Sequence, residues 1–192
     1  MSGTIERVLD FWFGPGWETG EVEPQAKWFK KDPIFDDSVK EWFSGMHAQA
    51  REGRMDGWMD EAVSALALVI VLDQFPRNMY RGEAAAFQSD GRALMWAAQA
   101  VDLGFDDQVP PVMRQFFYFP FEHSEDRGNQ AYAVRLFKQF ENHPQLASTY
   151  EFALRHQAIV DRFGRFPHRN AALGRASTME EVAFLQEPGS GF

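Results

Sequence analysis

The longest apolar stretch of the chain belongs to the sequence AVSALALVIVLDQFPRNMYRG of residues 62–82. Residues 65–72 carry no polar side chain, and Asp60 and Glu61 precede the stretch as acids of the kind that favour a helix start. We therefore predict a helix over residues 61–75 that is buried on every side and, at about 1.5 Å per residue, too short to cross a membrane. Pro76 is expected to end this helix, because proline disfavours helical geometry at the preceding residue and has no amide hydrogen.

Apolar residues recur at helical spacing through the rest of the chain, with glycine, proline and capping residues at the ends of the segments. This pattern predicts further helices over residues 4–13, 35–52, 89–103, 110–118, 126–141, 145–163 and 178–186. Ser177 and Glu180 form a capping-box pattern before the last of them. No segment alternates as a β-strand does, so we predict an all-α fold with one domain over residues 1–192, in which residues 187–192 form a frayed tail.

The dipeptide Phe-Pro occurs three times, at residues 75–76, 119–120 and 166–167, each at the predicted end of a helix. The three positions have similar spacing, which favours a repeat of antiparallel helix pairs. Chance alone would give about one such dipeptide in this composition, so the repeat is a hypothesis.

Asp73 is the polar exception within the central helix. We predict that it lies in the last turn, where the helix dipole disfavours a second negative charge. A buried carboxylate without a partner would cost several kcal/mol, so a cation should lie beside it. The candidates are arginines of its own turn, Arg77 or Arg81, or of a distant turn, Arg165 or Arg169.

Two arginine-rich turns, at residues 73–82 and 162–175, contain most of the polar residues that could bind a ligand. They hold six of the fourteen arginines and no lysine, and the planar guanidinium group suits bidentate contacts with carboxylate or phosphate. The candidate ligand-binding residues are Arg77, Asn78, Arg81, Arg165, His168, Arg169 and Asn170. An equally weighted alternative is a structural network in which the arginines cap helix ends and pair with Asp73, Glu122 or Asp161.

The segment EHSED of residues 122–126 offers a second constellation. His123 among carboxylates could act as a general acid, alone or with Glu122, and His168 is a further acid/base candidate. The favoured alternative is that Ser124 and the acids that follow it cap a helix and need no ligand.

Composition narrows the remaining function classes. The net charge of -9 argues against nucleic acid and anionic membranes as partners, and the lack of cysteine excludes thiolate chemistry. No metal motif or phosphate-binding glycine loop is present, so we predict neither a metal nor a cofactor. The N-terminus has no basic region or cleavage site and carries Glu6 and Asp10, which favours a cytoplasmic protein. The oligomeric state cannot be predicted from these residues.

Four segments of the chain resemble a known family. They are VLDFWFG (8–14), LDQFPRNMYRG (72–82), FYFPFEHSED (117–126), and RFGRFPHRNAALGR followed by STMEE (162–181). All four are similar to segments of the DUF924 family of bacterial proteins of unknown function. The resemblance implies an all-helical, tetratricopeptide-like fold and implies no activity.

The sequence is compatible with two functions. The first is a non-catalytic helical binding or scaffold protein that presents its arginines to a small anionic ligand or an acidic peptide. The second is a hydrolase or related enzyme that acts on a phosphorylated or carboxylated small molecule, with His123, Glu122 or His168 as acid/base. Whether the protein is an enzyme is left open at this stage.

Overall fold

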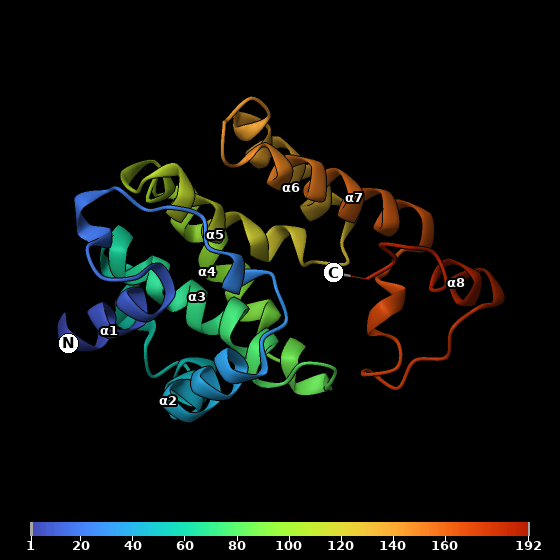
Figure 1. Cartoon of the computed structure of the whole chain (residues 1–192), viewed down its shortest axis with the longest axis horizontal. Helices are drawn as coiled ribbons and strands as arrows, with labels where there is room; N and C mark the ends of the chain where they lie inside the picture. The colour runs from blue at the N-terminus through green and yellow to red at the C-terminus, as the bar shows by residue number, and fades with distance from the viewer. Residues whose placement is uncertain (1, 192) are drawn as a thin grey trace.

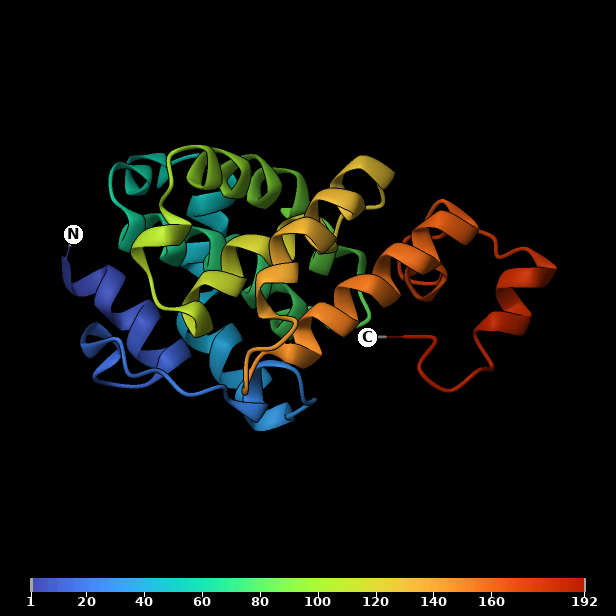
Figure 2. The same ribbon diagram turned by 90° about the horizontal axis from the view of Figure 1, so that it is seen from above.

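The computed structural model describes residues 2–191 and is all-α over that range, without a β-strand (Figure 1). Its α-helices are α1 (Ser2–Phe13), α2 (Pro33–Arg51), α3 (Ala62–Met79), α4 (Asp90–Asp102), α5 (Pro111–Glu122), α6 (Arg127–Phe137), α7 (Ala147–Phe163) and α8 (Met179–Phe184). Successive helices from α2 to α7 pack against one another, and α1 joins them by packing on α3. The segment after α7, which carries α8, lies at the opposite end of the molecule from α1 (Figures 1 and 2). None of the helices in the described range is long and apolar enough to cross a membrane.

Helix α3 forms the centre of the main hydrophobic core, as its apolar sequence predicts. Residues 65–73 are fully buried, and α3 packs against α1, α2, α4 and α5. Aromatic side chains fill the space between these helices; Trp12 and Phe43, for example, lie 5.6 and 4.6 Å from the ring of Phe75. The high aromatic content of the sequence therefore serves mainly to pack the core.

The prediction that Pro76 ends the central helix is wrong, because α3 continues to Met79. Proline at this position removes the amide hydrogen that would bond the carbonyl of Leu72. The hydroxyl of Ser89 takes its place and donates a 2.6 Å hydrogen bond to that carbonyl. Asp73 consequently lies more than one turn before the end of α3, so the expected penalty from the helix dipole is smaller and burial becomes the main cost.

Pro120 also lies inside a helix, in the last turn of α5, and only Pro167 follows the end of one. The three Phe-Pro dipeptides therefore do not mark equivalent helix ends. The capping box before α8 is formed by Thr178 and Glu181, one residue later than predicted, because Thr178 adopts the extended backbone of an N-cap.

A second, smaller hydrophobic cluster secures the C-terminal segment. Ile159 and Val160 of α7 pack with Phe166 of the following turn, and Phe184 of α8 lies against them. Beyond α8, the carbonyl of Gly189 accepts a hydrogen bond from Arg155. Of the predicted frayed tail, Phe192 lies outside the described residues, as does Met1 at the other end.

Candidate functional site

Asp73 is a fully buried acid with three polar partners. Its Oδ1 accepts a 2.8 Å hydrogen bond from Nδ1 of His123 and lies 3.5 Å from Nη2 of Arg77, while Oδ2 accepts a 2.6 Å bond from Gln74. Burial alone would raise the pKa of this carboxyl, but His123 and Arg77 outweigh burial and lower the pKa to about 2. Arg77, one of the arginines proposed from the same turn, lies beside Asp73, whereas the sequence did not indicate His123 as a partner.

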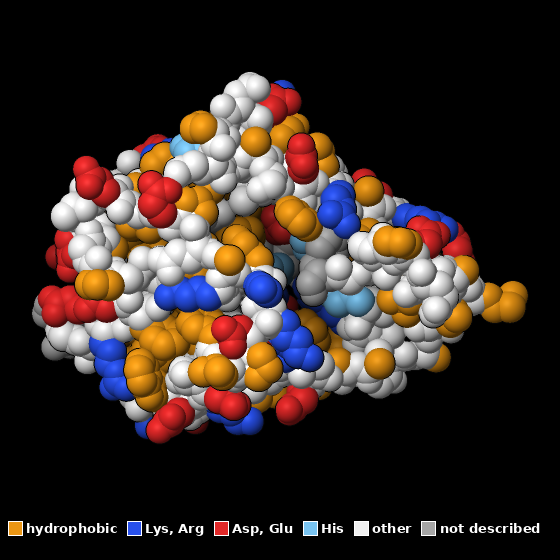
Figure 3. All heavy atoms as spheres, viewed as in Figure 1, with side chains coloured by type: hydrophobic (Ala, Val, Ile, Leu, Met, Phe, Trp, Pro, Cys, Tyr) orange, Lys and Arg blue, Asp and Glu red, His pale blue; other side chains and the backbone are white. Residues whose placement is uncertain are grey.

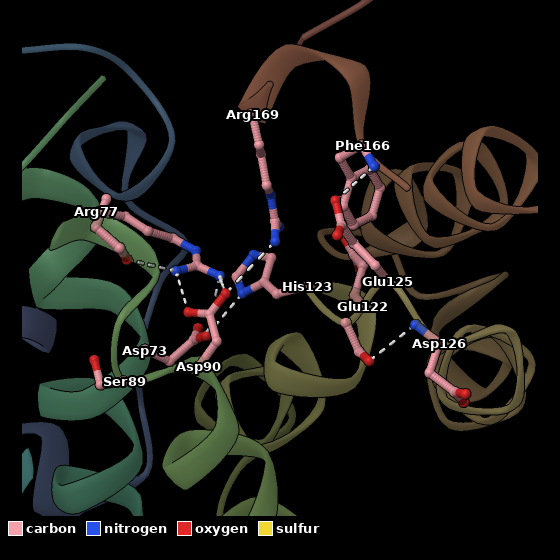
Figure 4. A network of polar contacts seen from close by, with 12 residues as sticks. Asp73, Arg77, Ser89, Asp90, Glu122, His123, Glu125, Asp126, Phe166 and Arg169 are labelled. Atoms are coloured by element: carbon pink, nitrogen blue, oxygen red, sulfur yellow. Dashed lines mark hydrogen bonds and ion pairs between the residues drawn. The ribbon is translucent and has the colours of Figure 1, made fainter. Parts of the chain in front are cut away.

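Arg77 joins Asp73 to a second acid, Asp90 at the start of α4. Its two terminal nitrogens donate to the two oxygens of Asp90 at 2.9 and 3.2 Å. Nη1 of Arg169, from the distant turn, lies 3.5 Å from Oδ2 of the same carboxylate. Figure 4 shows Arg77 and Arg169 approaching Asp90 from opposite sides. The two arginine-rich turns therefore meet through Asp90, an acid that the sequence did not indicate as a partner.

The guanidinium group of Arg169 is buried but poorly satisfied. It lies between two aromatic rings, 4.8 Å from the ring centre of Phe87 and 4.5 Å from that of Phe166, and the residue is 7% exposed. Within residues 2–191 no acceptor takes a hydrogen bond from it, and its Nε is buried without a partner. Burial, followed by the charge of Arg77, lowers the Arg169 pKa to about 10. This cation therefore has unused hydrogen-bond donors.

His123 presents one ring nitrogen for binding. Because the carboxylate of Asp73 can only accept, Nδ1 carries the hydrogen and Nε2 of the neutral ring is an acceptor. Nε2 is accessible, and it has no hydrogen-bond partner among residues 2–191. Burial, followed by the charge of Arg77, lowers the His123 pKa, which favours the neutral ring. The ring stacks on Phe119 with centroids 6.0 Å apart.

The expected acid/base pair of Glu122 and His123 is not formed, because these neighbours at the end of α5 have different partners. Glu122 lies 2.9 Å from Nδ1 of His156 on α7, whereas His123 contacts α3. Oε2 of Glu122 is buried without a hydrogen bond in the described chain. The two residues thus connect α5 to the helices on either side of it.

The acids that follow His123 have structural roles. Glu125 forms a bidentate ion pair with Arg175 at 2.7 and 2.9 Å and accepts a hydrogen bond from the amide of Phe166. Asp126 caps α6 by accepting a 2.9 Å hydrogen bond from the amide of Asn129. The capping interpretation of this segment is confirmed for Asp126.

The other candidates from the first arginine turn have their polar contacts elsewhere. Asn78 donates to Oδ1 of Asp36 at 2.7 Å, and Arg81 forms a bidentate pair with the same carboxylate at 2.8 and 2.9 Å. One turn of helix separates Asn78 from Arg81, so both reach Asp36 on α2, whereas Arg77 reaches α4. The expectation that all three converge is corrected accordingly.

The second turn divides in the same way. Arg165 pairs with Glu181 at 2.6 and 2.7 Å, and Asn170 donates to Ser177 and Glu181, so both connect the turn to α8. His168 is half-buried, with its ring 5.6 Å from that of Phe166. Burial, followed by Arg169, lowers the His168 pKa to about 3.

Of the seven predicted ligand-binding residues, only Arg77 and Arg169 come together, at Asp90. His168 is next to Arg169 in the chain. Figure 3 shows a hollow on this face of the molecule, with histidine and arginine or lysine side chains around it. It lies between the helical core and the C-terminal segment. No cluster of three or more potential metal ligands occurs among residues 2–191.

A separate groove of about 410 Å³ runs along α1, lined in part by Arg7, Asp10, Phe11 and Trp42. Asp10 accepts a hydrogen bond from Trp17, and the guanidinium group of Arg7 lies over a phenylalanine ring. None of these four side chains has a buried polar atom without a partner. We therefore place the candidate site at the hollow around Arg169, although the α1 groove is roomy.

Comparison with known proteins identifies the family of this chain. The model of the family described as "Bacterial protein of unknown function (DUF924)" matches residues 8–189. A solved structure, that of the protein of unknown function ATU0120 from Agrobacterium tumefaciens, is 38% identical in sequence with a TM-score of 0.86, over 97% of this chain and 99% of that one. No curated protein matched the chain. The resemblance noted in the four sequence segments is thus confirmed, and the chain belongs to the DUF924 family.

Proposed function

We propose that this protein binds a small carboxylate or phosphate in the hollow between the helical core and the C-terminal segment. The observation that carries the proposal is the guanidinium group of Arg169, which is buried between two rings without a hydrogen bond inside the described chain. Arg77 is its neighbour through their shared contact with Asp90.

A buried arginine normally has hydrogen-bond acceptors for most of its five N–H groups, because leaving a charged donor unsatisfied costs more than 1 to 3 kcal/mol. Asp90 at 3.5 Å gives Arg169 a loose ion pair and no hydrogen bond. The two phenylalanine rings hold the guanidinium plane and add cation–π attraction without using its N–H groups. A planar or tetrahedral oxyanion supplies the missing acceptors in the bidentate geometry that arginine favours.

The charges around the site favour a small ligand over an acidic peptide. Arg77 and Arg169 are balanced by Asp73 and Asp90, so the attraction for an anion depends on short, directional hydrogen bonds. The whole chain is acidic, with a net charge of -9, which gives no long-range attraction for a polyanion. Because Arg169 as a whole is only 7% exposed, the site also suits a ligand small enough to enter the hollow.

The test is ligand-dependent stabilisation. Phosphate, sulfate, acetate and succinate are titrated in thermal-shift and calorimetric experiments. An anion that binds should raise the free energy of unfolding of the wild type by about 2.7 kcal/mol at a concentration of 100 Kd. In a chain of this size that is a rise in Tm of roughly 5 to 10 °C. Arg169→Ala should abolish the rise, and Arg169→Lys should weaken binding because lysine lacks the planar fork.

The matched control is Arg135→Ala, which removes an equal charge from an exposed arginine over Tyr132 on α6. It should leave the ligand-induced rise unchanged. Circular dichroism of each variant confirms that it is folded before titration. If no anion stabilises the wild type, or if Arg169→Ala responds as the wild type does, the proposal is wrong.

A further inference from the structure

We propose that the anion bound at this site also carries a hydroxyl group, whose hydrogen bond is accepted by Nε2 of His123. The ligand class is therefore small hydroxy acids, in which one molecule bears both the acid and the hydroxyl. This inference rests on the anion site proposed above and adds a second, independent recognition element to it.

Nε2 of His123 can accept a hydrogen bond but cannot donate one. Asp73 fixes the hydrogen on Nδ1 through a 2.8 Å contact, so the neutral ring offers only a lone pair at Nε2. That lone pair has no donor among the described residues, yet it is accessible. Stacking on Phe119 and an edge contact with His156, at 6.0 and 6.4 Å between ring centroids, fix the plane of the ring. The acceptor is thus held in one direction before a ligand arrives.

A short chain of contacts connects His123 to Arg169. Oδ1 of Asp73 contacts both His123 and Arg77, and Oδ2 of Asp90 contacts both Arg77 and Arg169. The guanidinium group of Arg77 therefore lies between the two carboxylates. Asp73 contacts His123, which has the free acceptor, and Asp90 contacts Arg169, which has the free donors. In Figure 4, the side chains of His123 and Arg169 point toward the same region, from α5 and from the C-terminal segment.

The charges around Nε2 of His123 favour a hydroxyl group over a charged group as its donor. A second acidic group at this position would face the negative charges of Asp73 and Glu122, which already lie near His123. An ammonium group would be placed near the guanidinium group of Arg77. A hydroxyl group donates to Nε2 without adding a charge, and it therefore fits both the acceptor and the electrostatic surroundings.

The experiment compares acids that differ only by the hydroxyl group. Isothermal titration at pH 7.5 would use glycolate against acetate, each enantiomer of lactate against propionate, malate against succinate, and 2-hydroxyethyl phosphate against ethyl phosphate. In at least one pair the hydroxylated acid should bind the wild type about 3- to 10-fold more tightly, as expected for one hydrogen bond. The same titrations with alanine and glycine test whether an ammonium group is preferred.

His123→Asn is the informative variant. The asparagine amide keeps an N–H near the position of Nδ1 for Asp73, which protects the fold, and it removes the acceptor at Nε2. We expect the preference for the hydroxylated acid to disappear, while the affinity for the plain acid changes by less than about 2-fold, since Arg169 is intact.

Three results would overturn the inference while leaving the anion site in place. They are equal binding of every pair by the wild type, tighter binding of the amino acids than of the hydroxy acids, and a preference that survives in His123→Asn. If no acid of either kind binds, the anion site itself is refuted, and with it this inference.

Discussion

Replacement of Asp73 tests the central polar contact of the structure. Asp73→Ala leaves His123 and Arg77 beside a cavity in the core. The lost carboxylate neutralises Arg77 and fixes the orientation of the His123 ring. Breaking a buried ion pair by removing one partner typically costs about 3 to 5 kcal/mol, against roughly 0 to 1 kcal/mol for a surface pair. For a chain of this size the expected loss in Tm is about 6 to 20 °C.

Asp73→Asn removes the negative charge of the side chain and keeps its shape, so it measures the contribution of the charge alone. Gln74 can turn its amide to accommodate the new amide group, because both orientations fit the same outline, so the main loss is the negative charge. A pKa lowered from 3.8 to about 2 corresponds to roughly 2 to 3 kcal/mol of stability at neutral pH. Because the pKa is lowered on folding, this stability is complete above about pH 4 and is lost as pH falls toward 2.

Urea denaturation at pH 7, 4 and 2.5 measures both effects. The difference in unfolding free energy between wild type and Asp73→Asn should be largest at pH 7 and should shrink below pH 4. Asp102→Asn, which changes an exposed acid at the end of α4, is the control and should stay within about 0.5 kcal/mol of the wild type. A Tm for Asp73→Ala within 2 °C of the wild type, or a difference for Asp73→Asn that does not depend on pH, would refute the reasoning.

Three further predictions concern the surroundings of the site. Ser89→Ala should lower the unfolding free energy by about 1 to 3 kcal/mol in urea titrations, since the carbonyl of Leu72 and Nε2 of His47 both lose their partner. Adding Pro76→Ala should recover part of this loss, because the new amide can bond the Leu72 carbonyl. Burial lowers the His47 pKa to about 4, so the wild type should lose stability as pH falls from 6.5 toward 4, and His47→Gln should lose less. Arg81→Ala should cost about 0 to 1 kcal/mol and leave the anion-induced rise in Tm unchanged.

The helices could be predicted from the sequence because their signals are local. The apolar run of α3 and the glycine that ends α7 act within a few residues of the structure they specify. The error at Pro76 arose because its compensation is not local: the hydroxyl that replaces the missing amide comes from Ser89, on the next helix. The burial of His47 was missed for the same reason, since its partner is also Ser89.

The site was predicted in part. An arginine four residues after Asp73 lies on the same face of a helix, so the pair with Arg77 follows from spacing. His123 and Asp90 could not be identified as partners, because their positions depend on how α5 and α4 pack against α3. Arg165 and Arg169 lie in the same turn, and the sequence around them does not distinguish their roles. Only the packing of α8 decides that Arg165 is neutralised by Glu181.

The polar groups of this network fall into two sets with different expected consequences. Asp73 is fully buried and has partners on both oxygens, so its replacement should act mainly on stability. Arg169 and Nε2 of His123 have unused donors and an unused acceptor, so changes there should act mainly on ligand affinity. A purely structural network would be expected to satisfy these donors and this acceptor, because each unsatisfied polar group costs stability. If Arg169→Ala instead destabilises the unliganded protein as strongly as Asp73→Ala does, and no anion changes either Tm, the cluster is structural throughout.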